Sequence, residues 1–148
     1  MKKQLLALAV LALAAGTASA QANDTLAKIK SSGVVNLGVR DSSGLAFTVG
    51  GGKYVGFHTE MAERIVDDLK KVTGNPNLKI NYQVITSQNR VPLVQNGTID
   101  FECGSTTNNL TRQKDVAFAV TTYVEEVRMA VKANSGIKSI KDLAGKTV

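Results

Sequence analysis

One amphipathic segment, residues 57–72, dominates the pattern of this sequence and limits the ways in which the chain can fold. Its apolar side chains recur three and four positions apart, and charged side chains fill the positions between them. The apolar members of this stripe are Met61, Ala62, Ile65, Val66, Leu69 and Val72. The spacing predicts one long helix with a buried stripe, and the Gly-Asn-Pro sequence at residues 74–76 predicts where it ends.

Short apolar runs on both sides of this segment predict strands. Residues 34–39 form a nearly continuous apolar run, which is typical of a parallel strand covered on both faces. Residues 78–85 and 99–103 predict two more strands, and Ser87 is expected to cap a short helix between them. Strands that alternate with helices predict right-handed βαβ units, and therefore an α/β fold with a mainly parallel sheet. The sequence also predicts shorter elements: a helix capped by Asp24 or Thr25 and closed by Gly33, a hairpin over 45–56, and a short helix over 139–144.

The first 20 residues have the pattern of a secretory signal peptide. Lys2 and Lys3 precede an apolar run over residues 5–15, and residues 18–20 (Ala-Ser-Ala) supply small side chains at the cleavage positions. The run is shorter than the roughly 18 apolar residues that a transmembrane anchor needs. We therefore expect cleavage after residue 20 and export to the periplasm.

Charge and composition exclude several classes of function. The formal net charge is +6, but the basic residues are dispersed and lack the interleaved aromatic side chains that bind a nucleic-acid strand. The single histidine, His58, is expected on the surface, and no carboxylate pair shares metal-ligand spacing with it or with Cys103. Asp100 and Glu102 project from one face of their strand, which is weak evidence for acid–base chemistry. In an exported protein, Cys103 is either a buried inert thiol or the partner of a cysteine outside this sequence.

An arginine beside small hydroxyl residues follows each of the three predicted parallel strands. The three segments are 40–43 with Arg40, 86–90 with Arg90 and Ser87, and 104–112 with Arg112, Ser105 and Thr107. Ligands of such sheets bind at the carboxyl ends of the strands, and guanidinium groups with hydroxyls are natural receptors for carboxylates. The sequence therefore predicts a site for a small carboxylate ligand at this edge.

Three strings in this region resemble the periplasmic glutamate/aspartate-binding proteins of ABC importers: ITSQNR at 85–90, LVQNGT at 93–98 and DFECGSTTNN at 100–109. The resemblance implies a type II periplasmic binding-protein fold, with a three-layer αβα first lobe around a mainly parallel sheet and a second lobe that is truncated here. The boundaries that it implies are a signal peptide over 1–20, a first lobe with its crossover strand over 21–132, and the start of the second lobe over 133–148.

The resemblance also implies a role for each candidate site residue. Arg112 and Thr107 would hold the α-carboxylate of the amino acid, and Ser105 would accept a hydrogen bond from its ammonium group. The side-chain carboxylate would be bound by the remaining three residues: Arg40, Ser87 and Arg90.

The function that the resemblance implies is capture of L-glutamate or L-aspartate in the periplasm for an ABC permease in the inner membrane. No cofactor and no bond-breaking step are expected, and the full-length protein would be a monomer. Two alternatives stay open. An enzyme on the same fold, such as a periplasmic cyclohexadienyl dehydratase, would need a proton-transferring carboxylate or histidine in the cleft. An amino-acid-sensing module of a receptor would need transmembrane segments further along the chain.

Overall fold

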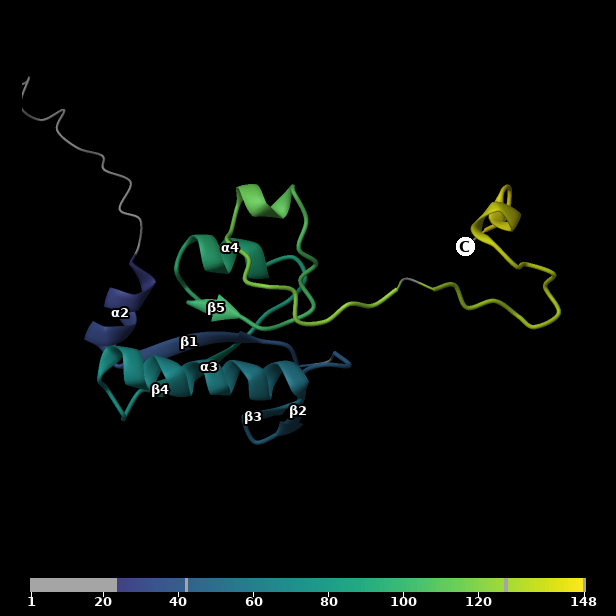
Figure 1. Ribbon diagram of the computed structural model, residues 1–148. Coiled ribbons are helices and arrows are strands. Elements are labelled where there is room, and N and C mark those ends of the chain that lie inside the picture. The colour runs from purple at the N-terminus through teal and green to yellow at the C-terminus, as the bar shows by residue number, and fades with distance from the viewer. Residues whose placement is uncertain (1–23, 42, 127, 148) are drawn as a thin grey trace, which may run out of the picture. The chain divides into compact units, whose positions relative to one another are not determined.

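The computed structural model describes residues 24–41, 43–126 and 128–147 (Figure 1). The chain divides into two compact units, of which the first ends at Ala117 and the second begins at Phe118. The predicted signal peptide lies outside the described residues. Within the described part, every helix is too short or too polar to cross a bilayer.

The first unit confirms the predicted order of strands and helices (Figure 1). Its parallel sheet and antiparallel hairpin are the arrangement expected from the alternating pattern. The elements, in chain order, are α2 (Thr25–Ser32), β1 (Val34–Val39), β2 (Phe47–Gly50), β3 (Lys53–Val55), α3 (Phe57–Thr73), β4 (Lys79–Val84), α4 (Arg90–Gln95), β5 (Phe101–Glu102) and the 3-10 helix η1 (Arg112–Lys114).

Strand β1 is the central strand of the sheet, whose order is β4-β1-β5. It pairs in parallel with β4, beginning with Val34 opposite Lys79, and with β5, beginning with Leu37 opposite Phe101. Alternate residues of β1 point toward α2 and α3, where Val35 and Leu37 are fully buried. Burial of each such side chain contributes about 1.5–3 kcal/mol to folding.

The opposite face of β1 is shaped by Gly38. A Cβ atom at this position would lie 2.8 Å from Ile99 Cδ1 and 3.2 Å from Ile85 Cδ1, so only a glycine leaves room for both side chains. Ile85 and Ile99 flank α4 in the sequence, and both are buried. Helix α4 therefore covers the face of the sheet opposite α3, as Figure 1 also shows, and the two faces together give the predicted three layers.

Helix α3 confirms the predicted long helix, but its buried line differs from the predicted stripe. Ile65 and Val72 are exposed, because the sheet contacts a narrower arc of the helix. The expectation that His58 lies on the surface is wrong: its side chain is 3% exposed. The His58 backbone N–H donates to the Leu45 carbonyl at 3.0 Å, so the loop before β2 covers the first turn of α3. The buried residues are His58, Thr59, Ala62, Val66 and Thr73.

The start of α4 also differs from the prediction. Ser87 does not cap this helix, which begins at Arg90 after a turn over residues 87–89. The Thr86 hydroxyl accepts from the N–H groups of Gln88 at 3.3 Å and Asn89 at 3.2 Å. The N–H of Thr86 in turn donates to Asn89 Oδ1 at 2.8 Å. Thr86 and Asn89 therefore close a turn before α4, where Ser87 was expected to cap the helix.

The second unit contains a short 3-10 helix, η2 (Ile140–Leu143), where the sequence predicts a short helix. Ser139 and Asp142 form a capping box at its start. Asp142 Oδ2 accepts from the backbone N–H of Lys138 at 3.0 Å and of Ser139 at 2.8 Å, and these bonds lower the pKa of the Asp142 carboxyl. The lobe boundary expected after residue 132 stays a prediction.

Candidate ligand-binding site

The carboxyl ends of β1, β4 and β5 meet at one edge of the sheet because the three strands are parallel. Arg40 follows β1, and its Nη1 donates to the carbonyl of Ile85, beyond the end of β4, at 3.2 Å. Arg90, the first residue of α4, donates from Nη1 to Ser105 Oγ, beyond the end of β5, at 3.4 Å. These two contacts bring together the three segments that the sequence singled out.

Arg90 is the buried member of this set, with a side chain that is 6% exposed. Burial lowers the pKa of its guanidinium, the negative charge of Glu102 raises it, and the positive charges of Arg112 and Arg40 lower it further. An arginine keeps its charge in proteins. The guanidinium groups of Arg40, Arg90 and Arg112, whose segments meet at this edge of the sheet, are called the arginine cluster below.

Arg112 is held against the loop that follows β5. Its backbone N–H donates to Asn109 Oδ1 at 3.0 Å, and its Nη1 donates to the carbonyl of Thr107 at 3.0 Å. The structure thus brings Arg112 to Thr107 through the backbone of that residue. Ser105 and Thr107 are both exposed, so their side chains face solvent at the edge of the sheet.

Ser87 is the predicted site residue that these contacts do not include. It is exposed in the turn before α4, while hydrogen bonds link the other five predicted residues to the edge of the sheet. A role for Ser87 toward a ligand stays a prediction.

Glu102 is a site residue that the sequence reasoning missed. It is the last residue of β5, and its Oε1 accepts a hydrogen bond from the Thr106 hydroxyl. Its Oε2 is buried and has no hydrogen-bond partner among the described residues. The available signal was the alternation that places Asp100 and Glu102 on one face of the strand, but this signal does not distinguish the two carboxylates.

Cys103 is half-buried beside Glu102. Burial, and to a smaller extent the charge of Glu102, raises the pKa of its thiol to about 11. A thiol with so high a pKa is protonated at neutral pH and is a poor nucleophile. Within the described residues, no group of three or more His, Cys, Asp or Glu side chains is arranged to hold a metal ion.

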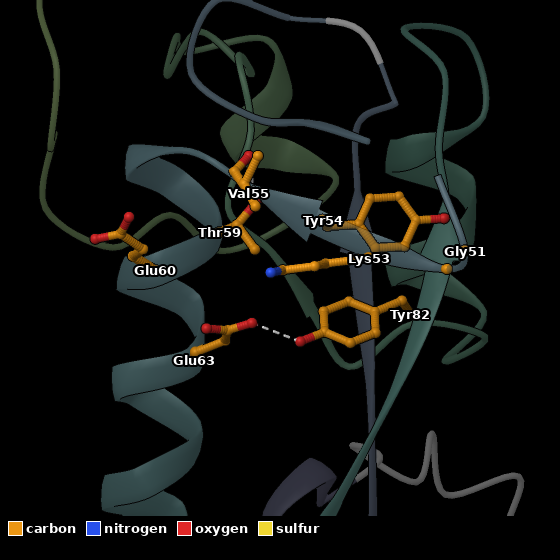
Figure 2. Close-up of a pocket in the computed structure, with 9 residues that line it drawn as sticks. Gly51, Lys53, Tyr54, Val55, Thr59, Glu60, Glu63 and Tyr82 are labelled. Carbon is orange, nitrogen blue, oxygen red and sulfur yellow. Dashed lines mark hydrogen bonds between the residues drawn. The ribbon is translucent and has the colours of Figure 1, made fainter. Parts of the chain in front are cut away.

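A separate hollow of about 360 Å³ lies between the β2–β3 hairpin, α3 and β4 (Figure 2). The Tyr82 hydroxyl donates to Glu63 Oε1 at 2.6 Å, and the Tyr54 and Tyr82 ring centroids lie 5.2 Å apart. Burial and the bond to Glu63 raise the pKa of Tyr82 to about 12. None of the six predicted site residues lines this hollow. Two carboxylates, Glu60 and Glu63, do line it, so the arginine cluster is the better candidate for a carboxylate site.

Comparison with known proteins places the chain in a family. The family model of bacterial extracellular solute-binding proteins, family 3, matches residues 35–144. The chain is 44% identical to the glutamate/aspartate import solute-binding protein of Salmonella typhimurium, over 100% of this chain and 51% of that protein. It is 43% identical to the L-glutamate/L-aspartate-binding protein of Pseudomonas aeruginosa, over 97% of this chain and 49% of that protein. The chain thus spans about half the length of these curated relatives.

A solved structure supports the fold. The crystal structure of a cysteine-binding protein from Campylobacter jejuni matches with a TM-score of 0.60 at 24% sequence identity, and the match covers 80% of this chain and 47% of that one. The predicted type II periplasmic binding-protein architecture, truncated relative to its relatives, is thereby confirmed.

Proposed function

Because the chain belongs to the bacterial extracellular solute-binding proteins of family 3, we propose that the complete protein captures L-glutamate or L-aspartate for uptake by an ABC importer. The observation that carries this proposal is the arginine cluster at one edge of the sheet. Each charge-assisted hydrogen bond to a carboxylate contributes roughly 1.5–3 kcal/mol. Several such bonds together supply the roughly 8 kcal/mol of binding free energy that corresponds to a micromolar dissociation constant.

The two carboxylates of an acidic amino acid have separate receptors in this proposal. Arg112 and Thr107 hold the α-carboxylate, and Ser105 accepts from the ammonium group. The side-chain carboxylate is bound by Arg40, Arg90 and Ser87. In support, the Arg112 side chain is fixed to the loop after β5, whereas Arg40 contacts the segment after β4.

Capture takes place without chemical conversion of the amino acid, as the names of the relatives as binding proteins suggest. The binding protein acts in the periplasm, which it reaches through the predicted signal peptide, and delivers its ligand to a permease in the inner membrane. It works as a monomer and needs no cofactor.

Titration calorimetry on the complete mature protein, including any chain that follows Val148, tests the proposal. We expect micromolar or tighter affinity for L-glutamate and L-aspartate and much weaker binding of L-glutamine. The amide of glutamine leaves the guanidinium groups of Arg40 and Arg90 without a charged partner. Equal affinities for glutamate and glutamine would contradict the proposal.

A further inference from the structure

We propose that the Glu102 carboxylate is an internal counter-ion of the arginine cluster, and that it limits how strongly the site prefers an acidic ligand to its neutral amide. The counter-ion role of Glu102 is argued from the arrangement of the chain's own residues. The effect of Glu102 on the preference for an acidic ligand rests on the proposed function.

Two buried polar atoms at the site lack hydrogen-bond partners among the described residues, Glu102 Oε2 and Arg40 Nε. They carry opposite charges and belong to neighbouring strand ends. Removing a carboxylate oxygen from water without a donor is costly, and nearby positive charge offsets that cost. The arginine cluster supplies this charge.

Gly104 shows how close Glu102 and Arg40 lie. A Cβ atom at Gly104 would come within 2.5 Å of Glu102 Oε2 and 3.7 Å of Arg40 Cγ. The carboxylate therefore occupies the space that any other residue at position 104 would fill. The absence of a side chain at Gly104 lets the carboxylate of Glu102 lie beside the Arg40 side chain.

Glu102 also acts on the buried groups around it. Its charge raises the pKa of Arg90, opposing the effects of burial and of the other two arginines. It likewise opposes the lowering of the His58 pKa by burial and adds to the raising of the Cys103 pKa. The Glu102 carboxylate thus offsets part of the positive charge that Arg40 and Arg112 place around the buried Arg90.

Glu102 has a second contact that an experiment must separate from its charge. The hydroxyl of Thr106 donates to Glu102 Oε1, and Thr106 stands between the proposed ligand residues Ser105 and Thr107. Glu102 therefore also holds the loop that carries these two residues. Glutamine at position 102 keeps an oxygen that accepts from Thr106 but removes the charge.

The first experiment compares Glu102→Gln with Thr106→Val in the complete protein by calorimetry with L-glutamate and L-glutamine. Without the counter-ion, we expect the ratio of glutamate to glutamine affinity to rise by about tenfold. Thr106→Val keeps the charge, so its ratio should stay within about twofold of the wild type. An unchanged or lower ratio in Glu102→Gln, with wild-type glutamate binding intact, would overturn the selectivity role alone.

The second experiment needs no ligand. The melting temperatures of Glu102→Gln, Arg40→Gln and the double variant form a double-mutant cycle in the ligand-free protein. A counter-ion pair predicts that the double variant loses less stability than the two single losses together, because neither charge is left unpaired. Additive losses would overturn the counter-ion role. This cycle tests the counter-ion role even if the wild type fails to bind glutamate. Failure of the wild type to bind glutamate would overturn the proposed function.

Discussion

Asp100 and Glu102 lie two residues apart in the sequence, Asp100 just before β5 and Glu102 at its end, yet the surroundings of their carboxylates are opposite. The Asp100 side chain is 1% exposed and accepts from Lys28 Nζ at 2.8 Å and from the Asn36 backbone N–H at 2.7 Å. The Glu102 carboxylate has one oxygen bound by Thr106 and the other without a partner in the described part of the chain.

The pairing of these two carboxylates thus differs between the two ends of β5. Just before β5, the buried carboxylate of Asp100 is fully paired within the chain, so its contribution goes to stability. Where β5 ends, Glu102 Oε2 has no hydrogen-bond partner among the described residues, and the carboxylate lies near the arginine cluster that we propose as the ligand site. Such incompletely paired charges cluster at functional sites. The predictions that follow test this contrast, beginning with the variant expected to have the largest effect.

Arg112→Ala in the complete protein should weaken binding of every amino acid by about 100-fold or more, because the α-carboxylate is common to all of them. Calorimetry with L-glutamate, L-aspartate and L-glutamine measures the loss, and the melting temperature of the ligand-free variant checks that it folds. If the affinities stayed within about threefold of the wild type, Arg112 would not be the α-carboxylate receptor.

Arg90→Ala should weaken L-glutamate by about 10-fold to 100-fold and L-glutamine much less, since one charge-assisted hydrogen bond to the distal carboxylate is lost. The same calorimetry measures both affinities. Equal losses for the two ligands would show that Arg90 does not distinguish a carboxylate from an amide.

Asp100→Ala should lower the free energy of unfolding by about 1.5–3 kcal/mol, because the Asn36 N–H loses its acceptor and Lys28 Nζ keeps only the Gly97 carbonyl. The matched control is Asp67→Ala, which removes an exposed partner of Lys70 and should lower the free energy of unfolding much less, because solvent screens an exposed ion pair. Denaturant unfolding measures both. Glutamate affinity should be unchanged in the folded Asp100 variant. A large loss of affinity would contradict the view that Asp100 contributes to stability and not to ligand binding.

His58 should give a smaller, pH-dependent effect. Burial lowers the pKa of its imidazole below the ordinary value of 6.5, and the charge of Glu102 opposes this only in part. The unfolded chain therefore takes up the proton first, so stability is fully present above pH 6.5 and falls as the pH drops below it toward the folded pKa. His58→Asn should remove this part of the pH dependence, measured by melting temperature from pH 7.5 to 5. A variant with the same slope as the wild type would contradict the assignment.

Local patterns predicted the elements of the first unit well. The spacing over residues 57–72 predicted α3, and the apolar run over 34–39 predicted the bounds of β1. What failed was the environment of single side chains. His58 is buried by a loop that precedes β2, and Ile65 is exposed because the sheet contacts a narrow arc of α3. Neither fact is encoded in the helix itself.

In the candidate site, too, the positions of residues could be predicted from local patterns, but the surroundings of single side chains could not. The position of Arg40, Arg90 and Arg112 at one edge of the sheet could be predicted because each follows a parallel strand, and parallel strands end at one edge. That Glu102 Oε2 is buried without a hydrogen-bond partner in the described part of the chain could not be predicted. Whether a carboxylate on a strand is paired depends on residues far along the chain, as the bond from Lys28 to Asp100 shows.

The most direct test of the account is a crystal structure of the complete protein with L-glutamate. We expect the ligand at the carboxyl ends of β1, β4 and β5, with its α-carboxylate on Arg112 and its side-chain carboxylate on Arg90. Glutamate seated instead in the hollow between Tyr54, Tyr82 and Glu63, with the arginine cluster empty, would contradict the assignment.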